Sequence, residues 1–330
     1  MKGRDAQGEL FELPPRKLAP APSVFSYREL AERVPSRVRL GTMSWSYPGW
    51  KDIVYAGDGS TKELSELGLT AYAEHPLLRA VEIDRSYYEP LSASAYRRYA
   101  EQVPEDFRFL VKAHEDAVVR RFPLHARYGK KRGASNPRYL DASYVTDAVV
   151  GPLVEGLGAK LGALLFQFPP ELEIAEPEAF AERLERFLSA LPDVARYAVE
   201  VRNPELLTRR YAAALAAASS LHCHNLWTTM PPLGAQARLI PPVARSPLIV
   251  RWLLRHGDPY AGASERFAPF DRLAGPDPEN RERVADLVAR ADAHGVPSLV
   301  LVDNKAEGSA PLGIAELARA IVEKRATLTA

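Results

Sequence analysis

Several short apolar stretches of the sequence end in a charged or amide side chain, and these side chains are the first candidates for chemistry. Carboxylates at such positions can move protons, and a lysine or arginine beside them can hold an anion. A charge buried in a sheet without a partner is costly, so each group needs a partner, solvent or a ligand. The candidates are Glu82, Lys112, Gln167, Glu200, Arg202, Arg251 and Asp303.

Two interpretations of this set remain open from the sequence alone. In the first, Glu82, Lys112, Glu200 and Arg251 form an internal ion-pair network that only stabilises the fold. In the second, the same side chains line a polar pocket. The second interpretation is favoured because the carboxyl ends of all strands of an α/β barrel meet at one face.

His222 and His224 form the only pattern with the spacing of metal ligands. Two residues apart on a strand, they lie on one face and can share a divalent metal with a carboxylate from another strand end. Cys223 then faces the opposite way and is expected to be a core residue. The alternative is a pair of hydrogen-bonded or acid–base histidines without a metal. The carboxylates considered as further ligands are Glu82, Asp84, Glu200 and Asp303.

Residues 108–140 carry nine lysines and arginines against two acidic residues, Glu115 and Asp116. Most of this charge lies in an insertion at about residues 115–138, where aromatic side chains are interleaved. Guanidinium groups bind phosphate through paired N–H groups, and aromatic rings stack on bases or sugars. We therefore expect the insertion to bind an anion, with a solvated or interface loop as the alternative. Its candidate binding residues, together with His114 just before it, are Arg120, Arg121, Lys130, Lys131 and Arg132.

The elements that must position these groups are eight short apolar segments, mostly separated by amphipathic stretches. Several segments are apolar on both faces, which is typical of buried parallel strands. The pattern predicts an α/β fold with a single TIM (β/α)8 barrel. An open doubly wound sheet is disfavoured because no glycine-rich dinucleotide motif follows the first strand. The predicted strands are residues 38–43, 80–84, 107–112, 161–168, 197–201, 220–224, 248–253 and 298–303.

Helix signals differ in strength along the chain. Asp277 as N-cap, Pro278 at the first helical position and Gly295 at the end predict a clear helix. Residues 227–244 contain four prolines and no clear helix signal. A final helix is expected over about residues 312–324. Residues 1–36 are proline-rich and predict an N-terminal extension that is partly ordered at most, which leaves residues 37–330 for the barrel.

Composition narrows the class of protein. The 330 residues carry 43 lysines and arginines against 42 acidic residues, so the net charge of +1 conceals the basic insertion. A single cysteine excludes intrachain disulfides and cysteine-only metal sites. No run approaches the ~18 apolar residues of a membrane span, and the N-terminus lacks a secretory apolar region. These features predict a soluble cytoplasmic protein without a membrane partner.

Four segments resemble motifs of a known family. They are GTMSWSYPGW at residues 41–50, VEIDRSYY at 81–88, FRFLVK at 107–112 and LGALLFQFPP at 161–170. The chain is similar over residues 38–322 to the YecE-like family, domain of unknown function 72. The resemblance implies a TIM barrel and supplies no activity, because none is assigned to the family.

The match to this family covers some candidate residues and departs at others. Glu82, Lys112, Gln167, Glu200 and Arg202 stand where the family motifs have them. Asn203 and Lys305 stand where the family commonly has histidine, and Ser44 replaces a glycine.

The leading hypothesis is an enzyme acting on a phosphate-bearing or otherwise anionic substrate, such as a phosphodiester. Lys112, Arg202 and the insertion would hold the anion, while Glu82 or Glu200 would act as general base. His222 or His224 would serve as acid–base group or metal ligand, with Asp303 as a further catalytic candidate. The other expected substrate contacts, aromatic walls included, are Trp45, Tyr47, Tyr88, His114, Gln167, Asn203, Arg251 and Asn304.

Two other functions stay open. A nucleic-acid-binding protein without catalysis would use the basic insertion and would bind with a steep salt dependence. A sugar isomerase or epimerase would require a bound divalent metal and would give the insertion no phosphate-binding role.

Overall fold

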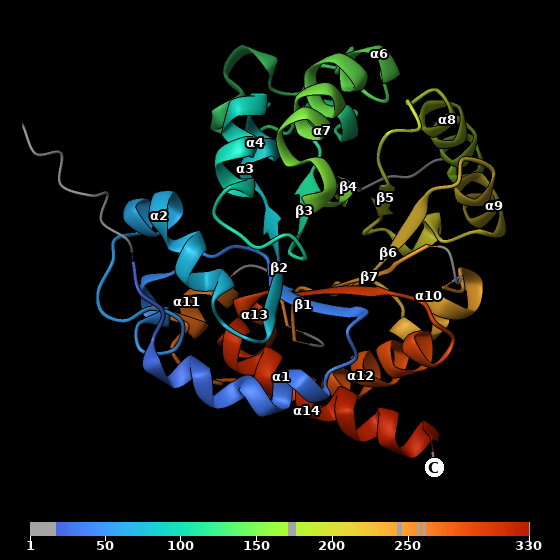
Figure 1. Cartoon of the computed structure of the whole chain (residues 1–330). Helices are drawn as coiled ribbons and strands as arrows, with labels where there is room; N and C mark the ends of the chain where they lie inside the picture. Colours follow the sequence, from blue (N-terminus) through green and yellow to red (C-terminus); the bar gives the residue numbers. More distant parts are fainter. Residues whose placement is uncertain (1–17, 171–175, 243–245, 256–257, 260–261, 330) are drawn as a thin grey trace, which may run out of the picture.

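The computed structural model describes residues 18–170, 176–242, 246–255, 258–259 and 262–329. Eight parallel strands close into a barrel in sequence order, so the predicted TIM-barrel fold is confirmed (Figure 1). Each predicted strand is present, with ends within about two residues of the expected ones. The strands are β1 Val38–Thr42, β2 Leu78–Ile83, β3 Arg108–Lys112, β4 Leu161–Gln167, β5 Tyr197–Glu200, β6 Leu221–Leu226, β7 Leu248–Trp252 and β8 Ser298–Val302.

Side chains alternate between the inside of the barrel and the layer of helices around it. One buried apolar cluster draws on residues in or beside all eight strands, which is only achievable inside the barrel. Its members are small at many positions, so charged side chains at the upper end of the barrel have room to turn inward. The cluster includes Met43, Ala80, Leu110, Ala163, Leu165, Ala198, Leu221, Cys223, Ile249, Leu299 and Leu301.

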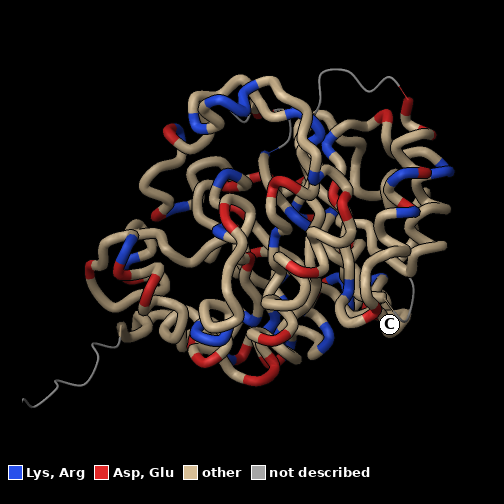
Figure 2. The backbone as a smooth tube through the Cα atoms, turned by 90° about the horizontal axis from the view of Figure 1, so that it is seen from above, with Lys and Arg blue, Asp and Glu red and all other residues tan. Residues whose placement is uncertain are grey.

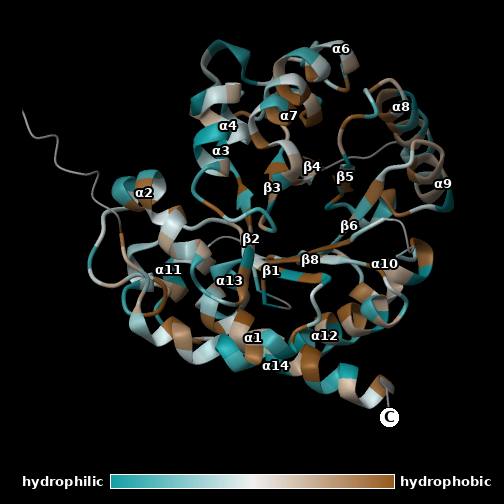
Figure 3. Ribbon diagram, in the orientation of Figure 1, coloured by the Kyte–Doolittle hydropathy of each residue, from teal (hydrophilic) through white to brown (hydrophobic). Residues whose placement is uncertain are grey.

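A larger apolar cluster fills the space between the strands and the outer helices. Figure 3 shows the mixed character of these helices, with hydrophobic and hydrophilic colours alternating along α12 and α14. Neighbouring helices in this layer pack on one another, for example α4 on α7 and α12 on α14. The outer helices are α2 Thr61–Ala73, α4 Ala93–Ala100, α7 Gly151–Leu157, α8 Pro177–Ser189, α9 Arg209–Ala217, α10 Leu233–Leu239, α12 Pro278–Ala293 and α14 Ala310–Thr329.

One of the helix predictions is confirmed, one is wrong and one is too short. The Asp277 carboxylate accepts the Asn280 N–H, and Pro278 is the first residue of α12, as predicted. The sequence gives no clear helix signal within residues 227–244, but the structure has a helix there, because α10 forms directly after Pro232. Proline is tolerated at a helix start, where its missing N–H would have no partner inside the helix. The last helix, α14, is longer at both ends than expected.

The connection between β3 and α7 contains the basic insertion. It begins with the short helix α5, Glu115–Val118, continues through the 3-10 turn η3, Ala126–Lys131, and ends with α6, Ala142–Val145. Both acidic residues of this segment serve as internal anchors, since Glu115 pairs with Arg127 and Asp116 pairs with Arg138 at 3.1 Å. The basic residues at its tip therefore keep their charge without a carboxylate from the segment itself.

The ordered part of the N-terminal extension lies against the barrel. After the 3-10 turn η1, Pro22–Tyr27, the short helix α1 spans Arg28–Arg33. The Ala21 N–H donates to the Val54 carbonyl at 2.9 Å, and Tyr27 stacks on His75. Residues 1–17, which the extension prediction also covers, lie outside the described residues. Among the described residues, no helix has the length and apolar character needed to cross a membrane.

Candidate functional site

A polar pocket opens at the carboxyl ends of the strands, and we call it the mouth pocket. It encloses about 360 Å³, which is within the range of small-molecule sites. Figure 2 shows acidic and basic segments interspersed around the barrel when it is seen from above. The pocket is lined by Met43, Ser44, Tyr47, Glu82, Asp84, Tyr87, Tyr88, Lys112, Gln167, Arg202, Arg251, Leu253, Asp303 and Lys305.

Arg251 lies at the floor of this pocket and joins two buried carboxylates. Its Nε and Nη2 donate to the two oxygens of Glu82 at 2.9 and 3.0 Å, which is a bidentate pair. Its Nη1 donates to Glu200 and, at 3.3 Å, to Gln167. Because β7 places Arg251 opposite β2 and β5, one guanidinium neutralises charges from both sides of the barrel.

Arg202 forms a second contact to Glu200. Its Nε donates to the other Glu200 oxygen at 2.8 Å, and its Nη2 donates to Gln167 at 3.0 Å. The same guanidinium lies 4.0 Å from the ring centre of Trp227, a favourable cation–π distance. Arg202 is thus held in place from two directions, with one edge left toward the pocket that it lines.

The two buried carboxyl groups have different proton affinities. Burial raises the pKa of Glu82 to about 7, because the attraction of Arg251 and Lys112 only partly offsets the loss of solvent. Burial also acts to raise the pKa of Glu200, but the charges of Arg251 and Arg202 outweigh it and lower that pKa to about 2. Near neutral pH, Glu200 is therefore ionised, while Glu82 exchanges a proton.

The rim of the mouth pocket consists of paired charges. The Lys112 ammonium donates to Asp84 at 2.5 Å and lies over the Tyr87 ring at 4.5 Å. Lys305 pairs with Asp303 at 2.8 Å. The ion-pair network expected as one alternative is thus real for Glu82, Glu200 and Arg251, whereas Lys112 belongs to a separate pair. Network and pocket coexist, because the paired side chains are also pocket walls.

Some predicted substrate contacts lie elsewhere. Trp45 packs into the core edge-on to Tyr99, with ring centres 5.4 Å apart. Asn304 is buried and its side-chain oxygen accepts from the Trp50 indole and the Ala310 N–H, so it supports the β8–α14 turn. Neither side chain lines the mouth pocket, and both predictions of substrate contact are corrected to structural roles.

Two further candidates lie near the pocket without lining it. His114 bonds through Nδ1 to the Tyr144 hydroxyl at 2.6 Å, beneath the basic insertion. Asn203 begins the 3-10 turn η6, Pro204–Leu206, immediately after Arg202. Their expected contact with substrate has no support from the pocket geometry.

The placement of His222 and His224 at the mouth is wrong. The register pairs His222 with Val199 and His224 with Val250, which both face the helices, whereas Cys223 pairs with the inward-facing Ile249. The cysteine therefore occupies the inside of the barrel, with Sγ 3.8 Å from Glu200, and the two imidazoles point outward. The carboxylates considered as shared metal ligands lie on the other face of the sheet.

No group of three or more histidine, cysteine or acidic side chains in the described part of the chain is placed to hold a metal ion. The residues present therefore do not assemble the divalent-metal site considered from the sequence. His222 instead bonds to the Tyr211 hydroxyl at 3.1 Å and to Gln236 at 3.3 Å.

The basic insertion contacts a wall of the mouth pocket through Arg127, which is not among the binding residues predicted from the sequence. Arg127 lies 5.1 Å from the ring centre of Tyr88, a pocket wall, and 4.5 Å from that of Tyr128. Tyr87 and Lys305 also line the pocket and were not predicted from the sequence, although each is adjacent to a predicted candidate. The five insertion residues that were predicted to bind the anion do not line the pocket; they are Arg120, Arg121, Lys130, Lys131 and Arg132.

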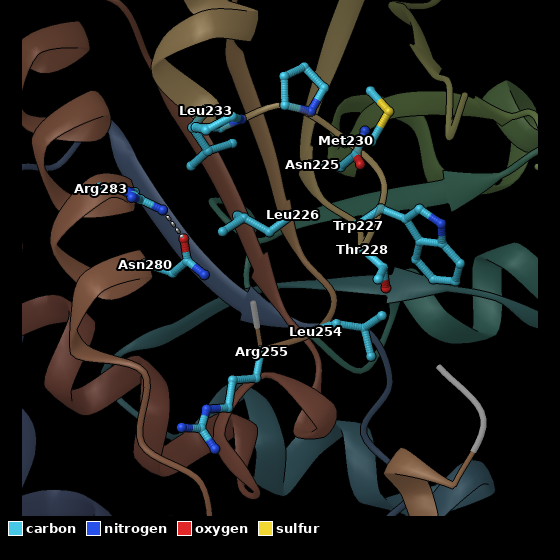
Figure 4. Close-up of a pocket in the computed structure, with 12 residues that line it drawn as sticks. Asn225, Leu226, Trp227, Thr228, Met230, Leu233, Leu254, Arg255, Asn280 and Arg283 are labelled. Atoms are coloured by element: carbon cyan, nitrogen blue, oxygen red, sulfur yellow. Dashed lines mark hydrogen bonds between the residues drawn. The ribbon is translucent and has the colours of Figure 1, made fainter. Parts of the chain in front are cut away.

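A smaller pocket lies beside the mouth, where the end of β6 meets the start of α12. Figure 4 shows Arg283 and Asn280 of α12 on one side and Trp227 on the other, with the 3.2 Å bond from Arg283 to Asn280 dashed. It encloses about 30 Å³, the share of one water molecule in the liquid. The mouth pocket, at about 360 Å³, is much larger and is therefore the preferred candidate.

Comparisons with known proteins agree with this architecture. The family model described as "Protein of unknown function DUF72" matches residues 39–330. Among curated proteins, none matches the chain.

Two solved structures show the fold at low sequence identity. A DUF72 family protein from Enterococcus faecalis V583 is 17% identical, with a TM-score of 0.59 over 86% of this chain and 95% of that chain. A DUF72 family protein from Thermotoga maritima MSB8 is 18% identical, with a TM-score of 0.55 over 89% of this chain and 99% of that chain.

Proposed function

Since this chain belongs to the DUF72 family, which is a family of unknown function, we propose an activity from its site alone: hydrolysis of a phosphate ester that binds in the mouth pocket. The preferred substrate class is a singly charged phosphodiester. The ionised Glu82 carboxylate takes a proton from water as the water oxygen attacks phosphorus. The bond from phosphorus to the leaving oxygen breaks, and that oxygen departs as an anion or takes a proton from solvent.

The observation that carries this proposal is the contrast between the two carboxyl groups bound to Arg251. Glu82 has a pKa of about 7, which suits a general base or acid at neutral pH. Glu200, with its pKa of about 2, stays ionised and holds both Arg251 and Arg202 in position. Carboxyl groups whose environments separate their pKa values are a common basis for dividing acid–base roles.

The charge of the pocket supports a monoanion. Four cations, Lys112, Arg202, Arg251 and Lys305, face the carboxylates of Asp84, Asp303 and Glu200, plus that of Glu82 when it is ionised. With Glu82 ionised, which is the form that takes a proton from water, these charges balance; with Glu82 protonated, one positive charge is in excess. In either state a phosphodiester, which has one negative charge, adds less uncompensated charge to the pocket than a doubly charged monoester does.

Two rim cations are suited to hold the phosphate. Lys112 has three N–H groups, and its contact with Asp84 involves one oxygen of that carboxylate. Arg202 lines the pocket with its guanidinium fixed by Trp227 and Glu200, so little side-chain freedom is lost on binding. Tyr47, Tyr87 and Tyr88 line the same opening and would pack against the organic part of the ester.

The test compares hydrolysis of bis(p-nitrophenyl) phosphate with that of p-nitrophenyl phosphate. We expect the diester to react faster, kcat to fall about 100-fold or more in Glu82→Gln, and KM to rise in Lys112→Met. Lys324→Met is the matched control, because Lys324 also forms an ion pair, with Glu282 on the outer helices. Equal diester rates in wild type and a folded Glu82→Gln would sink the assignment.

A second candidate function, nucleic-acid binding by the basic insertion, has an observation of its own. Within the described residues, Arg121, Lys130, Lys131 and Arg132 form no ion pair with a carboxylate. All four are exposed, on an insertion that contacts the pocket wall through Arg127 and Tyr88. Unpaired surface cations of this kind bind phosphate backbones by releasing counterions.

Fluorescence anisotropy of a labelled single-stranded oligonucleotide tests this second function over a series of salt concentrations. Replacing the four cations by glutamine is expected to weaken binding and to flatten the slope of log K against log salt. A matched control neutralises four exposed cations on the outer helices. Binding that ignores salt, or that the control weakens equally, contradicts a role for the insertion. The control residues are Lys62, Arg98, Arg183 and Arg186.

A further inference from the structure

The rim of the mouth pocket carries one aromatic side chain that is much more exposed than the other rings of the wall. Tyr88 ends the short helix α3, Arg85–Tyr88, and is 57% exposed although it lines the pocket. A tyrosine ring offers a large, flat contact surface and loses little conformational freedom on binding. Tyr88 is therefore the first candidate for a contact to the organic part of the ester.

Two other tyrosines line the same pocket, but protein side chains already engage them. Tyr87 is only partly exposed, and the Lys112 ammonium lies over its ring at 4.5 Å. Tyr47 packs against Trp50, with ring centres 4.9 Å apart, and edge-on against Phe270 at 5.4 Å. These two rings support the wall, whereas the exposed ring is the one that a ligand can cover.

Protein contacts also fix the orientation of the Tyr88 ring. It meets the Tyr87 ring nearly at a right angle, with ring centres 5.3 Å apart. The Arg127 guanidinium lies 5.1 Å from the centre of the Tyr88 ring and 4.5 Å from that of Tyr128. Arg127 in turn pairs with Glu115, which holds the guanidinium in place. Since the ring is already oriented, little side-chain freedom is lost when a ligand stacks on it.

The phosphate-binding side of the pocket is close to this ring. Tyr87 contacts both Lys112, the proposed phosphate contact, and Tyr88. A phosphate at Lys112 and an aromatic ring on Tyr88 can therefore belong to one small molecule, for which about 360 Å³ is sufficient room. Because the Tyr87 ring separates the two contacts, the aromatic group is joined to phosphorus through a spacer, as a base is through its sugar.

We propose that the ester in the mouth pocket carries a nucleoside, whose base stacks on Tyr88 while the phosphate lies at Lys112. Every base has a planar face that stacks on tyrosine, and a nucleoside is uncharged, so the ester stays a monoanion. This site rests on the phosphodiester hydrolase proposed above and adds the identity of one esterifying group. Tyr88 selects that group and takes no part in proton transfer, so its effect is on KM and not on kcat.

The experiment compares two monoanionic diesters with the same leaving group, thymidine 5′-(p-nitrophenyl phosphate) and methyl p-nitrophenyl phosphate. We expect kcat/KM to be about tenfold higher for the thymidine ester, through a lower KM. In Tyr88→Leu this preference should disappear, whereas Tyr88→Phe, which keeps the ring, should retain it. Phe25→Leu is the matched control and should behave like wild type, because Phe25 is also an exposed ring with an arginine, Arg28, over it at 4.6 Å.

Direct binding distinguishes a failure of this site from a failure of the hydrolase. Calorimetric titration of the full chain measures the Kd of thymidine 5′-(methyl phosphate) and that of dimethyl phosphate. If neither nitrophenyl ester is hydrolysed, but the thymidine probe binds about tenfold more tightly than dimethyl phosphate and loses this advantage in Tyr88→Leu, the hydrolase is wrong and the stacking site is supported.

The opposite outcomes overturn the stacking site and leave the hydrolase standing. They are hydrolysis of both nitrophenyl esters with equal kcat/KM, or a preference for the thymidine ester that Tyr88→Leu retains. Equal or undetectable binding of the two methyl phosphate probes overturns the stacking site as well. Circular dichroism of Tyr88→Leu checks its folding, which we expect to be intact because the side chain is exposed.

Discussion

The inside of the barrel and the helix-facing side of β6 bury polar groups in opposite ways. On the inner face, Glu82, Glu200 and Arg251 keep charges and match them with one another. On the outer face, His222 bonds to two neutral side chains, those of Tyr211 and Gln236, and neither His222 nor His224 forms an ion pair with a described residue. The first environment is ionic and the second is neutral.

This difference shows how burial selects a protonation state. Where an arginine is within hydrogen-bond distance, Glu200 stays ionised, and the pKa of Glu82 rises only to about 7. On the outer face burial is the largest influence, and it lowers the pKa of His222 to about 3 and that of His224 to about 4, although the charge of Glu200 acts to raise the pKa of His222. The inner face therefore keeps charged side chains near neutral pH, whereas the outer face keeps both imidazoles neutral.

The largest effect is expected when the shared cation of the inner face is removed. Arg251→Met leaves Glu82 without its bidentate partner and Glu200 with Arg202 alone. Removing one partner of a buried ion pair lowers the free energy of unfolding by about 3–5 kcal/mol, because the other charge stays buried without a partner. Urea unfolding at pH 7, followed by circular dichroism, measures this loss.

A charge-compensated variant serves as its control. Arg251→Met combined with Glu82→Gln removes both members of one ion pair and leaves Glu200 paired with Arg202, so most of the lost stability should return. If Arg251→Met alone costs less than about 1 kcal/mol, the inner face is not the matched network described here.

The next effect concerns how the stability of the inner face depends on pH. Because the pKa of Glu82 is raised from 4.5 to about 7 on folding, the folded state holds its proton more strongly. Stability therefore falls as pH rises from about 4.5 to 7, by about 2 kcal/mol between pH 5 and pH 7. Glu82→Gln should remove this decline from urea unfolding curves at the two pH values. An unchanged difference between the two pH values would show that Glu82 does not titrate in this range.

The outer face should respond to pH in the opposite direction. Since the pKa of His224 is lowered from 6.5 to about 4, the unfolded chain binds protons more strongly below pH 6.5. Stability is thus lost as pH falls, and His224→Gln should reduce the loss between pH 7 and pH 5 by about 1.5 kcal/mol. The exposed His125, replaced by glutamine, is the control. If His224→Gln leaves the loss of stability between pH 7 and pH 5 unchanged, that loss belongs to His222 or His75, whose pKa values are also lowered by burial.

The fold and most of the inner face follow from the sequence for a physical reason. Parallel strands buried on both sides are continuous apolar runs, so their ends can be located within about two residues. Side chains alternate along a strand, so every second residue counted from a strand end lies on the same face. This count places on the inner face five residues that line the pocket: Lys112, Gln167, Arg202, Arg251 and Asp303.

β6 shows where such counting fails. Its run His-Cys-His-Asn is polar on both faces, so composition does not determine which face is inside. Pairing with Val199 and Val250 on the neighbouring strands determines it, and those contacts are not local in sequence. The ion-pair partner of a charged side chain is likewise set by contacts that are not local in sequence. Lys112 pairs with Asp84 at the end of β2, and not with Glu82 of the ion-pair network.

The smallest effect is expected from the inward residue of β6, Cys223, which separates the two environments. Burial raises the pKa of its thiol, with the nearby Glu200 acting in the same direction, so the thiol stays neutral and takes no part in the ionic network. Cys223→Ala removes one buried heavy atom and should cost about 1 kcal/mol. Unlike Glu82→Gln and His224→Gln, it should leave the difference between pH 5 and pH 7 unchanged, as urea unfolding at both values can show. A change in that difference would mean that the two faces of β6 are electrostatically coupled through this residue, and the separation between ionic and neutral burial would then fail at this strand.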